Sequence, residues 1–224
     1  MTPQEEKGFV ERAFQTLKER GWFSQTGLVP TGVTDEEIAG FEKEYQLKIP
    51  SLYRAFLKSY QMNFHFWGIS NGPDMYTCPR PLTLCTGIKE LRDNMEGFRC
   101  TARTCFPYVA GPEQYGAYLP IGSWDSDWLL WDLSKPADRV LVDDPDFGAS
   151  WLLVSFAHDE QWDEAYWKEG GDPAAPDFKT LLEWFFCGTL IPEFEEENGV
   201  KVTYERLNNY DFLWHWYEDR WREK

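Results

Sequence analysis

Apolar positions near the start of the chain recur at helical spacing. They are Phe9, Val10, Ala13, Phe14 and Leu17, which fall on one stripe of a helix. Thr2 precedes this stripe and Glu5 follows Thr2 by three residues, the spacing of a capping box. Gly21 supplies a stop signal. The pattern predicts an amphipathic helix over residues 3–20.

Two further helices are predicted between residues 34 and 60. The first begins at Thr34, again with a glutamate three residues later, and carries Ile38, Phe41 and Tyr45 on one face. Pro50 suits the first turn of the next helix. Its apolar face is formed by Leu52, Tyr53, Phe56, Leu57 and Tyr60. The short connection between the two predicts a helical hairpin.

The middle of the chain has a strand pattern. Residues 61–116 lack a clear period and predict short strands and loops, with one short helix over 88–95. Residues 117–122, 128–133 and 139–142 then read as a meander, and 151–156 as a further strand. Residues 178–187 return to helical spacing and end at Gly188.

A single domain over residues 1–224 is therefore predicted. Its core covers about 34–190, with the helix 3–20 in front of it. Residues 157–177 are acidic and contain Gly170, Gly171 and two prolines, which predicts an exposed insertion. Residues 191–224 form an aromatic C-terminal extension, and no internal repeat is present.

The order of these motifs resembles the SUKH superfamily, the Smi/Knr-type proteins. The opening match is Ile38-x-x-Phe41-Glu42-x-x-Tyr45-x-Leu47-x-Ile49-Pro50-x-x-Tyr53-x-x-Phe56-Leu57. Residues 117–143 resemble the central hairpin of the family, and 177–188 its closing helix. The resemblance implies an α+β fold, with helices packed on one face of a mostly antiparallel, twisted sheet. It also implies a non-catalytic binding protein: bacterial members are similar to toxin-immunity proteins, and fungal members are regulators of cell-wall assembly.

Charge is distributed unevenly along the chain. The net charge is -16, but residues 1–112 hold 13 acidic and 13 basic side chains, and residues 201–224 hold 5 of each. Residues 113–200 hold 20 acidic and 4 basic side chains, so the whole excess lies there. Such a field repels nucleic acid and anionic membranes and attracts cationic partners.

Catalytic and metal-binding motifs are weak. The histidines His65, His158 and His215 belong to no known nucleophile or zinc motif. The spacings Cys78-x6-Cys85 and Cys100-x4-Cys105 are not those of a zinc site, and Cys187 fits a buried position. A calcium loop starting at Asp144 would place Ser155 where a glutamate is needed. No enzyme activity, metal or cofactor is expected.

One alternative interpretation is a glycosidase, in which the carboxylates act on a carbohydrate. Asp125, Asp127 and Asp132 are close in sequence, and glycosidases need two acids at a fixed separation. The twelve tryptophans are also compatible with a sugar-binding surface built from exposed aromatic rings. A second alternative is a regulatory scaffold of the cell-wall type.

The preferred interpretation is a protein-binding surface. Aromatic side chains beside carboxylates in loops suit a basic protein partner, here a toxin, such as a nuclease, made by the same cell. The predicted partner-binding residues are Trp124, Asp125, Asp127, Asp143, Asp144, Asp146, Asp159, Glu160, Trp162, Asp163 and Glu164. The acidic first residues and the lack of an apolar segment of membrane-spanning length predict a cytoplasmic protein.

Overall fold

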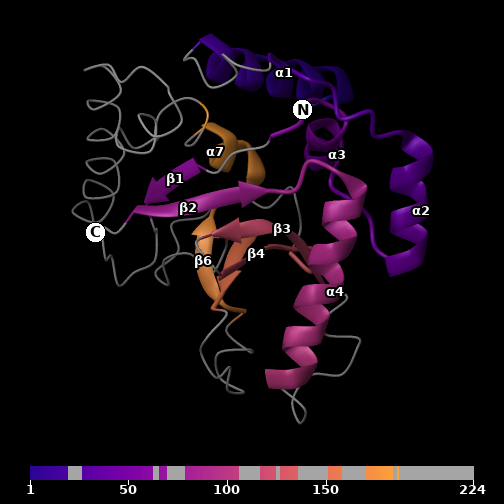
Figure 1. The fold of residues 1–224 in the computed structure, drawn as a ribbon, viewed down its shortest axis with the longest axis vertical. Coiled ribbons are helices and arrows are strands. Elements are labelled where there is room, and N and C mark those ends of the chain that lie inside the picture. Colours follow the sequence, from indigo (N-terminus) through magenta and orange to yellow (C-terminus); the bar gives the residue numbers. More distant parts are fainter. Residues whose placement is uncertain are drawn as a thin grey trace.

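A computed structural model gives the fold of the chain (Figure 1). It describes residues 1–19, 27–62, 66–69, 79–105, 117–124, 127–135, 151–157, 170–183 and 186. The helices are α1 (Pro3–Glu19), α2 (Asp35–Tyr45), α3 (Ser51–Leu57), α4 (Ile88–Cys105) and α7 (Phe178–Leu182). The strands are β1 (Phe66–Ile69), β2 (Pro79–Leu84), β3 (Tyr118–Trp124), β4 (Asp127–Asp132), β5 (Leu153–Phe156) and β6 (Asp172–Ala175).

The strands form one antiparallel sheet in sequence order, β1-β2-β3-β4-β5-β6. Each strand pairs with the next along the chain, as in a meander. The predicted α+β class and the mostly antiparallel sheet are confirmed. The strand predicted over residues 139–142 lies outside the described residues.

The predicted N-terminal helices are confirmed, together with their caps. Thr2 and Glu5 exchange hydrogen bonds at the start of α1, and Thr34 and Glu37 do the same at the start of α2. Each pair satisfies two backbone N–H groups that have no partner within the helix.

A buried carboxylate joins α2 to α3. Glu42 is 5% exposed, and its oxygens accept hydrogen bonds from the Ile49 backbone N–H at 3.0 Å, Lys48 Nζ at 2.9 Å and an Arg54 terminal nitrogen at 2.7 Å. Gln46 turns the chain in the left-handed region, with φ 56°. The hairpin predicted from sequence is therefore fastened at its turn by one side chain.

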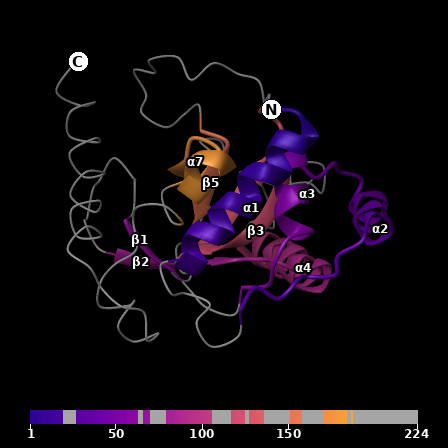
Figure 2. The same ribbon diagram turned by 90° about the horizontal axis from the view of Figure 1, so that it is seen from above.

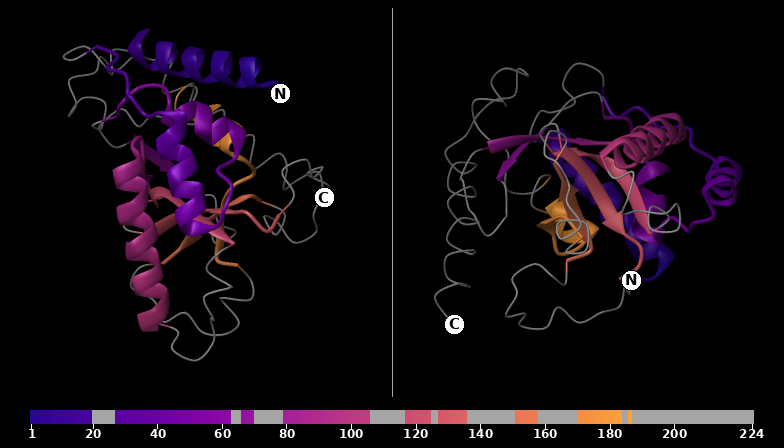
Figure 3. Two further views of the ribbon diagram at one scale, coloured as in Figure 1. Left: turned by 90° about the vertical axis from the view of Figure 1, so that its right-hand side faces the viewer. Right: turned by 90° about the horizontal axis from the view of Figure 1, so that it is seen from below.

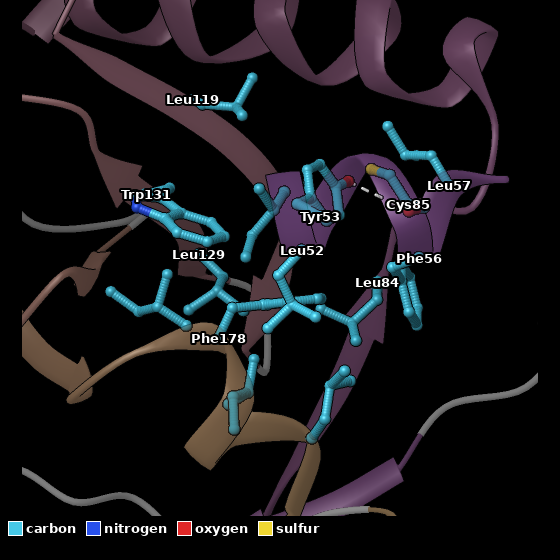
Figure 4. Packing of buried hydrophobic residues seen from close by; sticks show 14 of the residues in the cluster. Leu52, Tyr53, Phe56, Leu57, Leu84, Cys85, Leu119, Leu129, Trp131 and Phe178 are labelled. Carbon is cyan, nitrogen blue, oxygen red and sulfur yellow. Dashed lines mark hydrogen bonds between the residues drawn. The ribbon is translucent and has the colours of Figure 1, made fainter. Parts of the chain in front are cut away.

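The larger hydrophobic core lies between one face of the sheet and α1, α3 and α7. Tyr53 of α3 is fully buried against Trp131 of β4 and Phe178 of α7, with ring centroids 6.4 and 5.2 Å apart (Figure 4). Its hydroxyl donates to the Cys85 carbonyl at 3.1 Å. Helix α1 crosses over α3 (Figure 2) and inserts Phe14 against Phe56.

A second cluster covers the opposite face of the sheet. Successive residues of a strand point to opposite faces. Leu129 and Trp131 belong to the larger core, whereas Leu130 packs with Phe98 and Ala102 of α4. The strands consequently lie between α7 and α4 (Figure 3, right). This arrangement differs in one respect from the expectation that helices occupy a single face, because α4 extends beyond the hairpin and covers the second face.

Two predicted boundaries also differ. Helix α4 is longer than the predicted 88–95, and its apolar residues continue to Ala102. The end of the predicted exposed insertion forms β6 instead, where Ala174 and Ala175 are buried. No described helix is long and apolar enough to cross a membrane.

Candidate functional site

Three chain segments meet at one end of the sheet, which we call the turn end. Strands β3 and β4 are joined there, since Trp124 pairs with Asp127. Strand β5 also ends there, because Trp128 pairs with Phe156, and β6 begins there, because Ser155 pairs with Asp172. The turn end comprises residues 124, 127, 157 and 170–172.

Two groups of predicted partner-binding residues belong to chain segments that start or end at the turn end. Asp127 is half-buried at the first position of β4, and the backbone of Trp124 ends β3. Residues 157 and 170, which flank the segment containing Asp159 to Glu164, lie at the same end. The β3–β4 turn and the acidic insertion therefore leave the sheet as neighbours.

The remaining predicted residues lie outside the described part of the chain: Asp125, Asp143, Asp144, Asp146, Asp159, Glu160, Trp162, Asp163 and Glu164. The segment with Asp143, Asp144 and Asp146 connects Lys135 to Trp151. These two residues flank the opposite end of β4 and β5. The role of the acidic residues in partner binding stays a prediction.

Asp132 is separated from Asp127 by the length of β4. It is 4% exposed, and one of its oxygens accepts from the Ser134 backbone N–H and hydroxyl at 3.0 and 2.6 Å. Lys135 Nζ is 3.4 Å from its other oxygen. Asp132 therefore closes the turn after β4.

The suggested pairing of Asp127 with Asp132 in a glycosidase site is wrong. Five residues of strand separate their backbones by roughly 17 Å, and an odd spacing directs the two side chains to opposite faces. Two carboxylates so placed cannot flank one glycosidic bond, which requires a separation of about 5–10 Å.

Two glycines bring the chain back into the sheet at the turn end. Gly170 and Gly171 have φ of 82° and 75°, in the left-handed region. A Cβ on Gly171 would lie 2.6 Å from the Ser155 carbonyl oxygen and from the ring of Phe156. Only glycine fits this tight re-entry. The Gly-Gly pair was visible in the sequence, but its role in starting a strand was not.

An aromatic cluster supports the turn end from beneath. Phe98 of α4 meets Tyr118, Trp128 and Phe156 edge-to-face, with centroids 6.1–6.2 Å apart. Gly97 allows this approach, since a Cβ there would lie 2.7 Å from the Trp128 ring. Burial raises the pKa of Tyr118 well above its usual value, so its hydroxyl is neutral at physiological pH.

Trp151 and Trp128, which lie beside β5 and within β4, differ in burial. Trp151, two residues before β5, is 4% exposed and lies in the larger core. Trp128 packs against the second cluster and remains partly exposed. Trp162 and Trp167 lie outside the described residues.

The described cysteines form no metal site. Cys85 is buried, its sulfur accepts a hydrogen bond from the Asn94 side chain at 3.0 Å, and burial raises its pKa well above the usual range. Cys100 is exposed on α4. The described residues contain no cluster of three potential metal ligands, and the side chains of Cys78, Cys105 and Cys187 lie outside them.

Comparison with known proteins gives one match. The model of the SMI1/KNR4 family (SUKH-1) matches residues 32–185, more than half of the chain. The matched region runs from just before α2 into the segment that follows α7, and it includes every strand of the sheet. No curated protein and no solved structure matches.

Proposed function

Because the chain belongs to the SMI1/KNR4 family (SUKH-1), we propose that it is an immunity protein that binds and neutralises a basic toxin in the cytoplasm. The toxin is held by the turn end of the sheet and the acidic insertion that leaves it. The bound chain neutralises the toxin by blocking it sterically, and the chain itself catalyses no reaction.

The observation that supports this proposal is that the described residues flanking two acidic segments lie together at the turn end. Asp127 starts β4, and the insertion with Asp159, Glu160, Asp163 and Glu164 begins one residue beyond its neighbour strand β5. The net charge of -16 lies entirely within residues 113–200. A surface of one sign raises the rate at which a partner of opposite sign associates.

The strands that lead to the turn end are packed on both faces, which limits the conformational change needed for binding. Both faces of β4 are covered, and the edge-to-face aromatic contacts hold α4 against the strands that end at the turn. Groups held in place before association lose less conformational entropy on binding. A rigid sheet end is thus a suitable base for a tight protein inhibitor.

The test first searches the genes next to that of this chain for one that encodes a basic toxin domain, and then measures the association of that domain with the purified full chain. Reversing two acidic residues, Asp159→Lys with Glu160→Lys, is expected to slow association at least 10-fold at low salt. The matched control is Glu11→Lys with Glu19→Lys, an equal charge change on the exposed face of α1. Equal effects of the two pairs would show that only net charge matters and would contradict the proposed site.

A further inference from the structure

Two arginines lie one helical turn apart in the C-terminal half of α4. Arg99 and Arg103 have i, i+4 spacing, which places them side by side on the helix surface. This half of α4 extends past the end of α2 (Figures 1 and 3). Their surroundings differ from those of Arg54 and Arg92, which pair with carboxylates.

Arg99 lies over an aromatic ring. Its guanidinium carbon is 4.8 Å from the centroid of Tyr45, at the end of α2. The Tyr45 hydroxyl donates to Glu96 at 3.1 Å, which fixes the ring. Burial, followed by the hydrogen bond to Glu96, raises the pKa of Tyr45 to about 12, so the phenol remains a donor.

The Nε of Arg99 is buried and has no hydrogen-bond acceptor, whereas its terminal nitrogens are not among the buried unpaired atoms of the described residues. The cation–π contact compensates for the unpaired Nε. Arg99 as a whole is half-buried, so part of its side chain is accessible at the surface of α4.

Arg103 is anchored by a hydrogen bond to the backbone of its own helix. It is exposed, and its Nε donates to the Arg99 carbonyl at 3.1 Å. Within the described part of the chain, no carboxylate contacts the terminal amino groups of Arg99 or Arg103. By contrast, Arg54 pairs with Glu42 and Arg92 pairs with Glu44.

We propose that Arg99 and Arg103 form a binding site for a phosphate-type dianion. Each guanidinium presents a fork of terminal amino groups, and the two together supply two positive charges. A carboxylate is satisfied by one such fork, whereas a phosphate has oxygens and charge for two. The site is separate from the toxin-binding surface proposed above and does not depend on it.

A simpler role for Arg103 makes a different prediction. A cation in the last turn of a helix offsets the negative end of the helix dipole, and this needs no ligand. In that case added phosphate screens all exposed arginines alike, and no saturable binding occurs. The two cases are therefore separable by a titration.

The experiment follows the arginine Nε–H signals of the isotope-labelled full chain by NMR. Inorganic phosphate replaces chloride at constant ionic strength. Saturable shifts at Arg99 and Arg103, with a Kd on the order of 1 mM or tighter, are expected. Arg12, an exposed arginine of α1 with no carboxylate within ion-pair distance among the described residues, is the internal control and should not saturate. Linear shifts of all three signals would overturn the proposal.

Two variants test the geometry. Arg103→Gln removes one fork at an exposed position and should weaken phosphate binding about 10-fold. Arg99→Lys keeps the charge but loses the fork, and it should weaken binding similarly if bidentate contacts matter. Arg12→Gln should leave the Kd unchanged. Unchanged affinity in both α4 variants, with the fold retained by circular dichroism, would also overturn the site.

A second titration identifies the source of the anion. A short peptide containing phosphoserine replaces inorganic phosphate, and the same peptide with serine is the control. Tighter binding than inorganic phosphate indicates a phosphorylated partner, and equal or weaker binding indicates the free anion. Binding of the serine peptide at the same affinity would contradict recognition of phosphate.

Discussion

Glu42 is the residue on which the helical hairpin depends most directly. A carboxylate that is 5% exposed must be compensated, and here a backbone N–H and two cations do so. Burial acts to raise the pKa of Glu42. The hydrogen bonds from Lys48, Ile49 and Arg54 outweigh it, so the pKa lies below its usual value. The ionised form is therefore the one that stabilises the fold.

Glu42→Gln is expected to lower the free energy of unfolding by about 2 kcal/mol at neutral pH, because it removes a buried charge from two cationic partners. The contribution of the wild-type carboxylate is present above its unfolded-state pKa, near 4.5, and is lost as the pH falls through the lower folded-state value. Urea unfolding at about pH 7 and about pH 3 should therefore show a smaller pH effect in the variant.

A control separates this effect from general acid destabilisation. Glu44→Gln removes a carboxylate paired with Arg92 at the surface and should cost less than about 1 kcal/mol. If Glu42→Gln keeps the full pH dependence of the wild type, the lowered pKa of Glu42 does not contribute to acid unfolding.

Gly122 and Gly40 differ in the space available for a Cβ atom, so alanine substitutions at the two positions should have opposite effects. A Cβ on Gly122 would overlap the carbonyl oxygen of Thr83 at the irregular register of β3, whereas a Cβ on Gly40 of α2 meets no atom within 4 Å. Gly122→Ala should therefore lower the free energy of unfolding by about 3 kcal/mol. Gly40→Ala should raise it by about 0.5–1 kcal/mol. Thermal unfolding of both variants measures this, and a loss of stability in Gly40→Ala would show that its surroundings are more crowded than described.

At the scale of elements, α1 is notable because it precedes the matched family region at residues 32–185 and still completes the larger core. Phe14 is fully buried and contacts Phe56, Tyr60 and Phe186, with centroids 5.3–5.5 Å apart. The buried Glu6 accepts a hydrogen bond from the Ser51 hydroxyl at 2.6 Å. The helix is thus an integral part of the domain.

Phe14→Ala should lower the free energy of unfolding by about 4 kcal/mol, since it leaves a cavity among three aromatic rings. Gln15→Ala, the neighbouring exposed position on the same helix, should change it by less than about 0.5 kcal/mol. Denaturant unfolding followed by tryptophan fluorescence measures both. Similar values for the two variants would contradict the tight packing of α1 on α3.

The elements could be predicted where periodicity and capping agreed, as in α1 and α2. Periodicity alone predicted α3, because Pro50 is its N-cap residue and not part of its first turn, and no side chain caps the helix. The length of α4 was missed, although Leu91, Met95, Phe98 and Ala102 continue its stripe. Gly97 and the threonines that follow weaken the local helix preference, and tertiary packing on Trp128 overrides it. Strand β6 was missed because Pro173 within it and Pro176 after it indicate a loop, and it is formed only through pairing with β5.

The site could be predicted only as a set of residues. Charge segregation along the sequence located the acidic stretch, but register decides which acids share an end of the sheet. Consecutive apolar residues in β4, Leu129 to Trp131, contained a signal for burial on both faces. For Arg99 and Arg103 the sequence shows only the i, i+4 spacing, because the contact of Arg99 with Tyr45 depends on the packing of α2 against α4.

At the scale of the whole molecule, opposing charges are balanced in residues 1–112 and 201–224 and unbalanced in residues 113–200. Within the first region, Arg54 of α3 pairs with Glu42 of α2, and Lys58 at the C-cap of α3 pairs with Asp35 of α2. The surplus of -16 belongs to residues 113–200. Like charges gathered in one region destabilise the folded state through repulsion, unless a cationic partner or salt screens them.

This imbalance predicts that salt stabilises the free protein. Raising NaCl from about 20 mM to about 200 mM shortens the Debye length from roughly 20 Å to below 10 Å, which weakens repulsion across residues 113–200 more than it weakens the short ion pairs. An increase of about 1 kcal/mol in the free energy of unfolding is expected. In the variant Asp143→Asn, Asp144→Asn, Asp146→Asn the salt effect should be smaller, while Glu11→Gln with Glu19→Gln on α1 should leave it nearly unchanged. A fall in the free energy of unfolding with added salt would show that the ion pairs of the helices contribute more than the repulsion within residues 113–200. The repulsion would then give a basic partner no extra stabilisation to supply.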